Sequence, residues 1–477
     1  MKNILTTKNK KIFITTFIIF FLVHLPLITK NIISADILLN NYYYKGYSWE
    51  ISLGRFGLFL IGIIKSYLTI PHIDIILSYI IISISTIIIL DLFNTKNKLK
   101  IILFILIITL SPITSSTLLF NYCSLAYTLA FQTSILSVYT YYKFSNKYLK
   151  YIVPAILIII TLSLYQAYFS VIITLFILYN INNKINYKSF FKFILTVLIS
   201  IISYFIIMKF SQVIFHINMS SYSNADKIDL NLITSIPNKI IDSYKLLYNF
   251  YFTNSIIKNT YLHNNIINLL LLIILTIEII INNKNINIKN KLIKYFFFLT
   301  LPIYLNSIIF LIPGTKLQLL MSSSYLLIYL YIVTLLPNNK FKYLPLFIFI
   351  ILFRNNLIQV ESTYLTLENT YNKYESIIKS AAYTNINNNY QYVLINKEKT
   401  KYTEINNLNY GFISDDSIFW EEYNLRKLGF LRFSKEYLGL DLNYVDENTY
   451  NRLKNKKYNK LITTKDNIII IDLSKIN

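Results

Sequence analysis

Long apolar runs alternate with short polar segments along most of this 477-residue chain. A helix that crosses a bilayer needs roughly 20 apolar residues, within a range of about 17 to 25. Runs of this length predict about eleven spanning helices, near residues 12–29, 73–92, 101–119, 123–142, 151–165, 167–181, 193–212, 264–283, 296–312, 318–336 and 343–358. The pattern therefore predicts an all-α polytopic membrane domain over residues 1–358.

The distribution of lysine indicates how these spans are oriented. Lysines gather in alternate loops, which include Lys96, Lys147, Lys188, Lys291 and Lys340, and the intervening short loops contain few. Loops rich in Lys and Arg stay on the cytoplasmic side of a membrane. The first apolar run follows a Lys-rich start, is longer than a signal-peptide core and lacks a small-residue cleavage site after it. We therefore predict a cytoplasmic N-terminus.

Two apolar stretches need a separate interpretation. A single helix over 151–181 would be about 45 Å long, which exceeds a hydrocarbon core of roughly 30 Å. We expect a hairpin there, with the Tyr165–Tyr168 segment at its outer apex. Residues 56–70 are interrupted by Lys65, and a span there would invert every later loop, so we predict an interfacial amphipathic helix.

Three regions then remain on the outer side of the membrane. They are the loops 30–72 and 213–262 and the tail that follows the last span. Strand-like runs at 392–395 and 467–473, together with a short predicted helix at 417–428, indicate a small α/β domain. We predict that residues 359–477 form this extracytoplasmic C-terminal domain.

Composition agrees with a membrane protein and narrows its chemistry. Only 14% of the residues are charged, against roughly 25% in soluble domains. The formal charge of +23 is typical of nucleic-acid binding, but the lysines sit in loops where they set topology, so we predict no nucleic-acid partner. The single cysteine, Cys123, excludes a disulfide framework and is expected to be packing. The four histidines lack metal-ligand spacing and no Gly-rich nucleotide loop occurs, so we predict no metal and no cofactor.

The first outer loop holds most of the candidate chemistry. Asp36 lies just beyond the first span, where a partly desolvated carboxylate could accept a proton from a hydroxyl nucleophile. Arg55 offers a fork of donors that suits a phosphate. Tyr47, Trp49 and Glu50 could contact a sugar, although an interfacial aromatic belt and a solvated loop acid explain such residues equally simply.

Four motifs occur in order along residues 12–340. They are Asp36 after the first span; Trp49, Gly54, Arg55 and Gly57 in a W-x-x-x-x-G-R-x-G pattern; Ser111-Pro112 with Phe120-Asn121-Tyr122; and Ser163-Leu164-Tyr165-Gln166-Ala167-Tyr168. With these motifs the sequence resembles the Gtr type II glucosyltransferase family, which modifies O-antigen and related surface glycans. The C-terminal tail carries no motif of that family.

The resemblance implies a polytopic glycosyltransferase of the GT-C type in a bacterial inner membrane. Its donor would be a polyprenyl-phosphate-linked hexose, expected to be glucose, and its acceptor a surface glycan such as the O-antigen of lipopolysaccharide. It implies that Asp36 is the base, that Arg55 binds the donor phosphate, and that Asn121, Tyr165 and Gln166 line the pocket. Many relatives carry two adjacent acids where this chain has Asp36-Ile37, which favours a reaction without a required metal.

The expected reaction is a direct displacement that inverts the anomeric centre, with cationic groups stabilising the departing phosphate. Lys316, in a short outer loop, is a second candidate phosphate ligand, although a topology lysine explains it as well. A partner flippase could supply the donor. Gly54, Gly57 and Gly62 are expected to form a packing face, and Asp415-Asp416 to cap a helix.

Two other classes of function stay open at this point. A surface-polysaccharide polymerase or ligase shares outer-face chemistry but usually has paired arginines, whereas Arg55 and Arg354 stand far apart in this sequence. A transporter or flippase of lipid-linked sugars would explain the spans but not the long first loop and the tail. It would also place ionisable groups near the membrane midplane, and Asp91 and Glu278 fall near the cytoplasmic ends of predicted spans.

Overall fold

We describe a computed structural model of the chain. The residues that it describes are 6–33, 35–40, 44–183, 186–220, 232–252, 264–282, 288–311, 318–336, 343–383, 390–396, 419–454 and 456–475. These residues form two compact units, and each is described by itself. The first unit comprises Met1–Leu25 and Tyr43–Val360, and the second comprises Pro26–Tyr42 and Glu361–Asn477.

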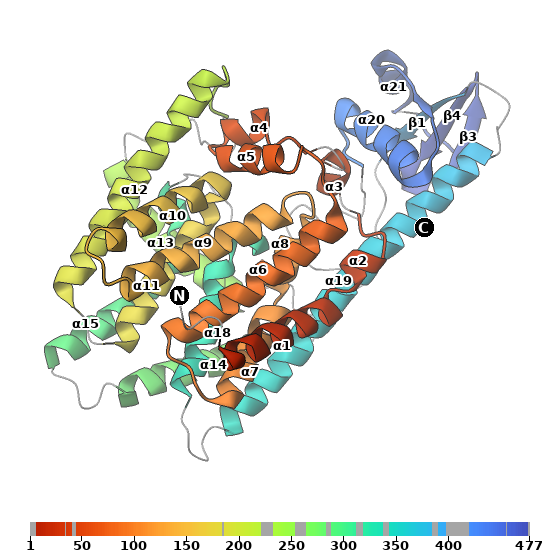
Figure 1. Cartoon of the computed structure of the whole chain (residues 1–477). Helices are drawn as coiled ribbons and strands as arrows, with labels where there is room; N and C mark the ends of the chain where they lie inside the picture. Colours follow the sequence, from red (N-terminus) through yellow and green to blue (C-terminus); the bar gives the residue numbers. More distant parts are fainter. Residues whose placement is uncertain are drawn as a thin grey trace. The chain divides into compact units, whose positions relative to one another are not determined.

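The first unit is helical throughout its described part (Figure 1). Its helices are α1 (Thr7–Val23), α4 (Ser48–Ser52), α5 (Phe56–Ile64), α6 (Pro71–Leu92), α7 (Lys98–Leu110), α8 (Pro112–Leu119), α9 (Ser124–Lys143), α10 (Leu149–Leu164), η1 (Gln166–Tyr168), α11 (Phe169–Asn182), α12 (Tyr187–Ile214), α13 (Leu232–Phe252), α14 (Asn264–Asn282), α15 (Ile288–Leu299), α16 (Leu301–Leu305), α17 (Ile308–Leu311), η3 (Leu319–Met321) and α18 (Ser323–Leu335). The helix α19 (Tyr343–Tyr383) begins in this unit and continues into the second.

Among the described residues, three helices are long and apolar enough to cross a membrane. They are α6, α12 and the part of α19 from Pro345 to Tyr383. The pair α7 and α8 would make a fourth span, bent by 42° where Ser111 is followed by Pro112. Proline at the first turn starts a new helix rather than continuing the old one. The chain is thus a mostly helical membrane protein, as predicted, while the number of eleven spans stays a prediction.

Several predicted spans differ from the helices that form. The run 296–312 is divided among α15, α16 and α17, and the first of these breaks falls where Pro302 lacks an N–H group for a continuous helix. The interfacial helix expected over 56–70 ends at Ile64. The helix α19, which contains the last predicted span, continues past residue 358 to Tyr383. The polar residues that follow the apolar run therefore do not end the helix. The run 151–181 divides where the predicted hairpin has its apex, since α10 and α11 are separated by Tyr165 and the short helix η1.

Hydroxyl side chains are frequent inside the apolar helices of the first unit. Ser78, Ser83 and Thr86 of α6 each donate to the carbonyl oxygen four residues earlier, at 2.7, 2.7 and 2.9 Å. Such bonds satisfy a hydroxyl within its own helix, which allows it to be buried. The helix α9 packs against both α6 and α10, and Cys123 before it is buried and unpaired by any disulfide among the residues described.

The second unit contains the predicted C-terminal sheet. Its strands are β1 (Gln391–Ile395), β2 (Asn443–Tyr444), β3 (Ile462–Lys465) and β4 (Ile468–Asp472), in the order β2-β1-β4-β3. Strand β1 is parallel to both β2 and β4, and β3 is antiparallel to β4. The sheet is therefore mixed, and the strands expected at 392–395 and 467–473 correspond to β1 and β4.

Helices complete this unit and supply the rest of its core. They are α2 (Pro26–Thr29), α3 (Ala35–Leu39), the second part of α19, α20 (Tyr423–Arg432), the π-helical turn η7 (Phe433–Tyr437), α21 (Glu447–Leu453) and η8 (Leu473–Lys475). The helix predicted at 417–428 is α20, which begins six residues later and whose predicted start lies outside the described residues. The first outer loop was expected to be one segment, yet its part up to Tyr42 belongs to this unit.

Candidate active site

The part of the first outer loop that belongs to the first unit closes on itself between Tyr44 and Tyr67. The Tyr44 N–H donates to the Tyr67 carbonyl at 3.0 Å, and α4 and α5 lie between them. Gly46 has a φ of +56°, and a Cβ there would come within 2.9 Å of the Leu58 backbone. Only glycine fits such a close approach in this conformation. The loop is therefore a tightly folded pair of short helices.

Arg55 directly precedes α5, and its side chain reaches the Tyr165–Tyr168 segment between α10 and α11. Its Nε donates to Gln166 Oε1 at 3.2 Å, and its guanidinium carbon lies 4.7 Å from the centre of the Tyr165 ring. Within the described part of the chain, its two terminal nitrogens make no hydrogen bond. Those nitrogens keep the donors that a phosphate accepts from arginine.

The surroundings of Arg55 keep its guanidinium group protonated. Burial by itself lowers the pKa of this guanidinium, but Tyr127, Tyr165 and further acidic groups nearby raise it overall. The ring of Tyr165 in turn stacks on that of Tyr127, with centroids 4.4 Å apart. A permanent cation against aromatic faces is stabilised without being neutralised. The group thus remains available to a negatively charged ligand.

Gln166 holds the arginine in place through bonds to three residues, two in the first outer loop and one in α12. Its Nε2 donates to the Leu53 carbonyl at 2.7 Å and to the Tyr204 hydroxyl at 3.0 Å, while its Oε1 accepts from Arg55. The Tyr204 hydroxyl donates in turn to the Gly54 carbonyl at 3.0 Å. The Gln166 side chain is buried. A fully satisfied buried amide of this kind fixes the geometry of everything it binds.

Two glycines allow this close arrangement. Gly54 has a φ of +79°, and a Cβ there would lie 2.5 Å from the Tyr204 hydroxyl and 2.7 Å from the Met208 sulfur. A Cβ on Gly57 would lie 2.6 Å from Ser163 Oγ. The expected packing role of the glycines is thus visible at both positions, and it brings the loop against the hairpin and α12.

The acidic and basic residues beside Arg55 are paired. The Tyr44 hydroxyl donates to Glu50 Oε1 at 2.7 Å. Lys65 and Asp74 form an ion pair of 2.5 Å, in which the Asp74 side chain is only 4% exposed. Tyr44 and Lys65 also line a small cavity together with Tyr122 and Cys123. Glu50, predicted as a substrate contact, is therefore engaged by a tyrosine of its own loop.

The other predicted contacts lie in more open positions or outside the described residues. Trp49 and Tyr47 are exposed, and the ring of Tyr47 meets those of Phe59 and Phe215. Asn121 is partly buried just before α9, where its carbonyl accepts from Ser124. Lys316 lies outside the described residues. The structure thus brings together Arg55, Tyr165 and Gln166 but leaves Trp49 and Tyr47 at the surface.

Asp36 belongs to the second unit, in the first turn of α3. Its carbonyl accepts from both the backbone and the side chain of Asn40, at 3.1 Å each. Burial raises the pKa of the Asp36 carboxyl to about 6. A carboxylate with a raised pKa binds a proton more tightly, which makes it a stronger general base once it is ionised.

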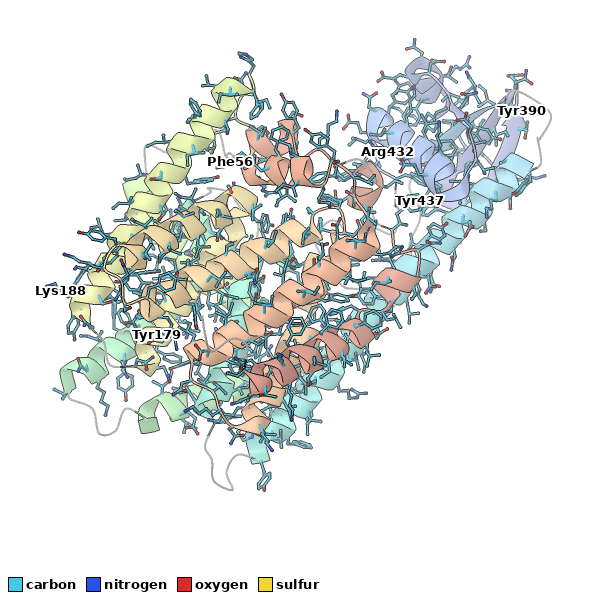
Figure 2. The ribbon with its side chains drawn as sticks, viewed as in Figure 1. Phe56, Tyr179, Lys188, Tyr390, Arg432 and Tyr437 are labelled. Atoms are coloured by element: carbon cyan, nitrogen blue, oxygen red, sulfur yellow. The ribbon has the colours of Figure 1, made fainter. Side chains whose placement is uncertain are left out.

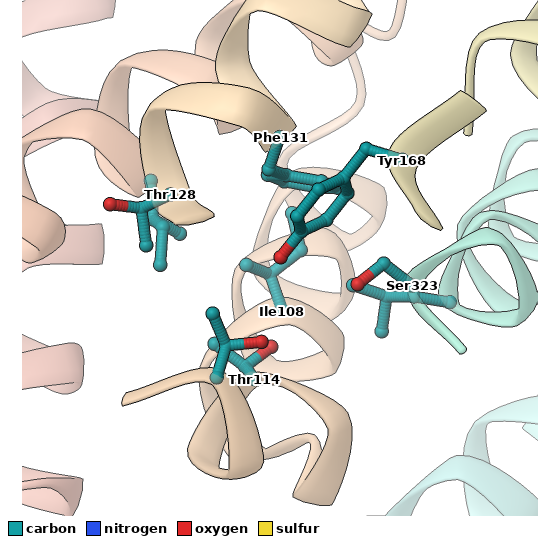
Figure 3. A pocket seen from close by; sticks show the side chains of 9 residues that line it. Ile108, Thr114, Thr128, Phe131, Tyr168 and Ser323 are labelled. Atoms are coloured by element: carbon teal, nitrogen blue, oxygen red, sulfur yellow. The ribbon is translucent and has the colours of Figure 1, made fainter. Parts of the chain in front are cut away.

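A second polar cluster lies among the helices of the first unit, around the hydroxyl of Tyr168. Figure 3 shows this hydroxyl pointing toward Thr114, with Ser323 beside it. Tyr168, Thr117 and Ser323 line the same cavity, which measures about 20 Å³. This volume suits about one water molecule, which the hydroxyl groups in the lining could bind.

Tyr204, Tyr44 and the Lys65–Asp74 pair join this site without having been predicted. Tyr204 occurs within a predicted span, in a chain with 42 tyrosines, so its position carries no distinguishing pattern. A signal did exist for Asp74, because a carboxylate at the start of an apolar helix requires a partner when it is buried. The nearest lysine in sequence, Lys65, is that partner.

A mostly helical chain with apolar helices of spanning length, and with a half-buried arginine held between a loop and the segment Tyr165–Tyr168, is an integral membrane protein with a candidate anion-binding centre. Residues 25–335 match the family model described as Glucosyl transferase GtrII, and the chain belongs to this family. The protein is therefore a glucosyltransferase, a hexosyltransferase by class, as the resemblance implied. No curated protein matches the chain, and no solved structure does.

Proposed function

We propose that this glucosyltransferase takes glucose from a polyprenyl-phosphate carrier and transfers it to a surface glycan at the outer face of a bacterial inner membrane. The observation that carries the proposal is the Arg55 centre. A half-buried cation, held by Gln166 and Tyr165 and with its terminal donors free among the described residues, suits a phosphate monoanion or diester better than a neutral sugar. A lipid carrier is the phosphate donor that reaches such a centre from the bilayer.

In the proposed reaction the acceptor hydroxyl oxygen attacks the anomeric carbon of the donor. The bond between this carbon and the phosphate oxygen breaks, and its electron pair leaves with the polyprenyl phosphate. The hydroxyl proton passes to the Asp36 carboxylate, and Arg55 stabilises the charge that develops on the phosphate. A single displacement inverts the anomeric configuration. The step requires no metal in this scheme.

The test is glucosyl transfer in membranes that contain the wild type, Asp36→Asn or Arg55→Ala, supplied with polyprenyl-phosphate glucose and the native glycan. General-base catalysis contributes about 10²- to 10⁴-fold, so Asp36→Asn should lower the rate at least about 100-fold. Arg55→Ala should lower it by about 10²- to 10³-fold. The matched controls are Asp441→Asn and Arg452→Ala, two exposed positions in the second unit.

Each outcome separates one element of the proposal from the others. Equal transfer by Asp36→Asn and the wild type removes the base assignment. Equal transfer by Arg55→Ala removes the phosphate assignment. Transfer from a nucleotide-linked glucose in place of the lipid-linked donor would reject the carrier while leaving the enzyme class intact. Anomeric analysis of the product by NMR tests the predicted inversion.

A further inference from the structure

The segment that carries Asp36 is packed into the C-terminal unit. Residues Pro26–Tyr42 and Glu361–Asn477 form one compact unit, although they lie at opposite ends of the chain. Ile33, Ile37 and Leu38 are at most 1% exposed, and they belong to the same apolar core as Phe430 and Phe433. Ile37 and Leu38 directly follow Asp36. Their burial fixes the helix α3 on which Asp36 stands.

Arg432 binds the end of this short helix. It is the last residue of α20 and is labelled in Figure 2. Its Nη1 donates to the carbonyl oxygens of Leu38, at 3.4 Å, and of Leu39, residues that lie 394 and 393 positions away in the sequence. The last carbonyls of a helix lack partners within the helix, and a cation there is favourable. Arg432 therefore caps α3 at its C-terminal end.

Gly429 allows α20 to approach α3 closely. A Cβ at this position would lie 3.2 Å from Leu38 Cδ2, which is tighter than ordinary contact. Gly429 and Arg432 are three residues apart, so they lie on the same face of α20. The face that meets α3 thus combines a residue without a side chain and a residue that donates to the helix end. An ion pair of 2.6 Å between Lys30 and Glu368 adds a further anchor for the same segment.

We propose that the C-terminal unit positions the candidate base, and that Arg432 is a positioning residue for glucosyl transfer. This inference rests on the proposed role of Asp36. The family match ends at residue 335, so the proposal assigns a role in the reaction to a part of the chain that the family match does not include. The chemistry itself stays with Asp36, and Arg432 acts only through the helix that it caps.

The experiment compares the purified full-length wild type with Arg432→Ala, Arg432→Lys and the exposed control Arg452→Ala. Amide hydrogen exchange of residues 35–40 reports the order of α3, and steady-state kinetics report kcat and the donor KM separately. We expect Arg432→Ala to accelerate exchange in α3 and to lower kcat about tenfold while the donor KM stays unchanged, because the base is displaced rather than the donor site. Arg432→Lys, which keeps one cationic donor, should restore a large part of kcat.

Gly429→Ala is a second variant that keeps α20 folded, because alanine favours a helix more than glycine does. It should crowd Leu38 and lower kcat a few-fold, again without a change in the donor KM. Unchanged kcat in Arg432→Ala despite accelerated exchange in α3 overturns the positioning role. So does a loss of kcat with α3 exchange unchanged.

Asp36→Asn, assayed alongside, separates this inference from the proposed function. If this variant transfers glucose at the wild-type rate, the base assignment itself fails, whatever Arg432 does. If it is inactive while Arg432→Ala retains full kcat, only the positioning role fails. Inactivity of Asp36→Asn together with lowered kcat and loosened α3 in Arg432→Ala supports both.

Discussion

Gly54→Ala tests whether the close packing around Arg55 is required. Gly54 adopts a φ of +79°, and an alanine Cβ would come within 2.5 Å of the Tyr204 hydroxyl and 2.7 Å of the Met208 sulfur. A non-glycine residue in this left-handed conformation costs about 1–2 kcal/mol. Crowding in a well-packed site costs about 1–3 kcal/mol. The local penalty is therefore about 2–5 kcal/mol.

The penalty falls on the bonds that hold Arg55. Relief of the clash moves Tyr204 away from the Gly54 carbonyl, or moves Gln166 away from Leu53 and Arg55. At about 1.4 kcal/mol for each factor of ten, we expect kcat/KM for glucosyl transfer to fall at least about 30-fold. The assay is transfer from polyprenyl-phosphate glucose in detergent, with protein amount normalised to the folded fraction from size-exclusion chromatography.

Gly439→Ala is the matched control for this variant. Gly439 has a φ of +67°, but a Cβ there meets nothing within 4 Å. The Gly439→Ala variant therefore has the backbone strain of Gly54→Ala but not its crowding, and its rate of transfer should stay close to that of the wild type. Adding Tyr204→Phe to Gly54→Ala removes the hydroxyl that causes the shortest contact, so the double variant should lose less than the sum of the single losses. Equal activity of Gly54→Ala and Gly439→Ala would refute the reasoning.

Three further predictions concern charged groups. Arg55→Lys removes the bond to Gln166 and the planar fork, so the donor KM should rise about tenfold or more in steady-state kinetics. The rate of wild-type transfer should increase as the pH rises through about 6, because burial raises the pKa of Asp36 to that value and only the ionised form accepts a proton; initial rates on both sides of this pH test it. Lys65→Ala leaves the Asp74 carboxylate buried and unpaired, which costs about 3–5 kcal/mol. Its melting temperature in detergent should fall, and Asp74→Asn in the same chain should restore part of the loss.

Part of the fold was predictable because its signals are local. Hydropathy and the length of the apolar runs locate α6, α12 and the division between α10 and α11, and strand-like apolar runs locate β1 and β4. The short strand β2 has two residues, Asn443 and Tyr444, and forms only by pairing with β1. No local pattern marks a strand of that length. The sheet order was accordingly beyond prediction, whereas the presence of a sheet was not.

The candidate site likewise contains residues that a sequence motif marks and a residue that no motif marks. Gly54, Arg55, Tyr165 and Gln166 were singled out as parts of ordered motifs, and they meet in the first unit. Tyr204 was missed because one hydroxyl in an apolar helix has no distinguishing spacing. Its importance arises only when α12 is packed beside the loop, where one hydroxyl both accepts from Gln166 and donates to Gly54.

The first outer loop shows why the tail could not be interpreted from sequence. Its two parts belong to different units, and the divide falls near Tyr42 without a change in composition. The contacts that decide it are long-range, such as the bond from Arg432 to Leu38 across 394 positions. The apolar side chains of Ile33 and Ile37 indicate that this segment is buried, but they do not indicate on which apolar surface it packs. Tertiary partners, rather than local preference, therefore determine which unit a short helix joins.

This arrangement constrains how the tail can vary. The helix α3 has five residues, too few to be stable in water without tertiary packing. It lies inside the region matched by the family, but the apolar core and the arginine that hold it come from beyond residue 335. A changed tail in this chain must therefore keep an apolar surface and a donor for the end of this helix. If Asp36 is the base, the tail is free to change in sequence only as far as it keeps those two functions.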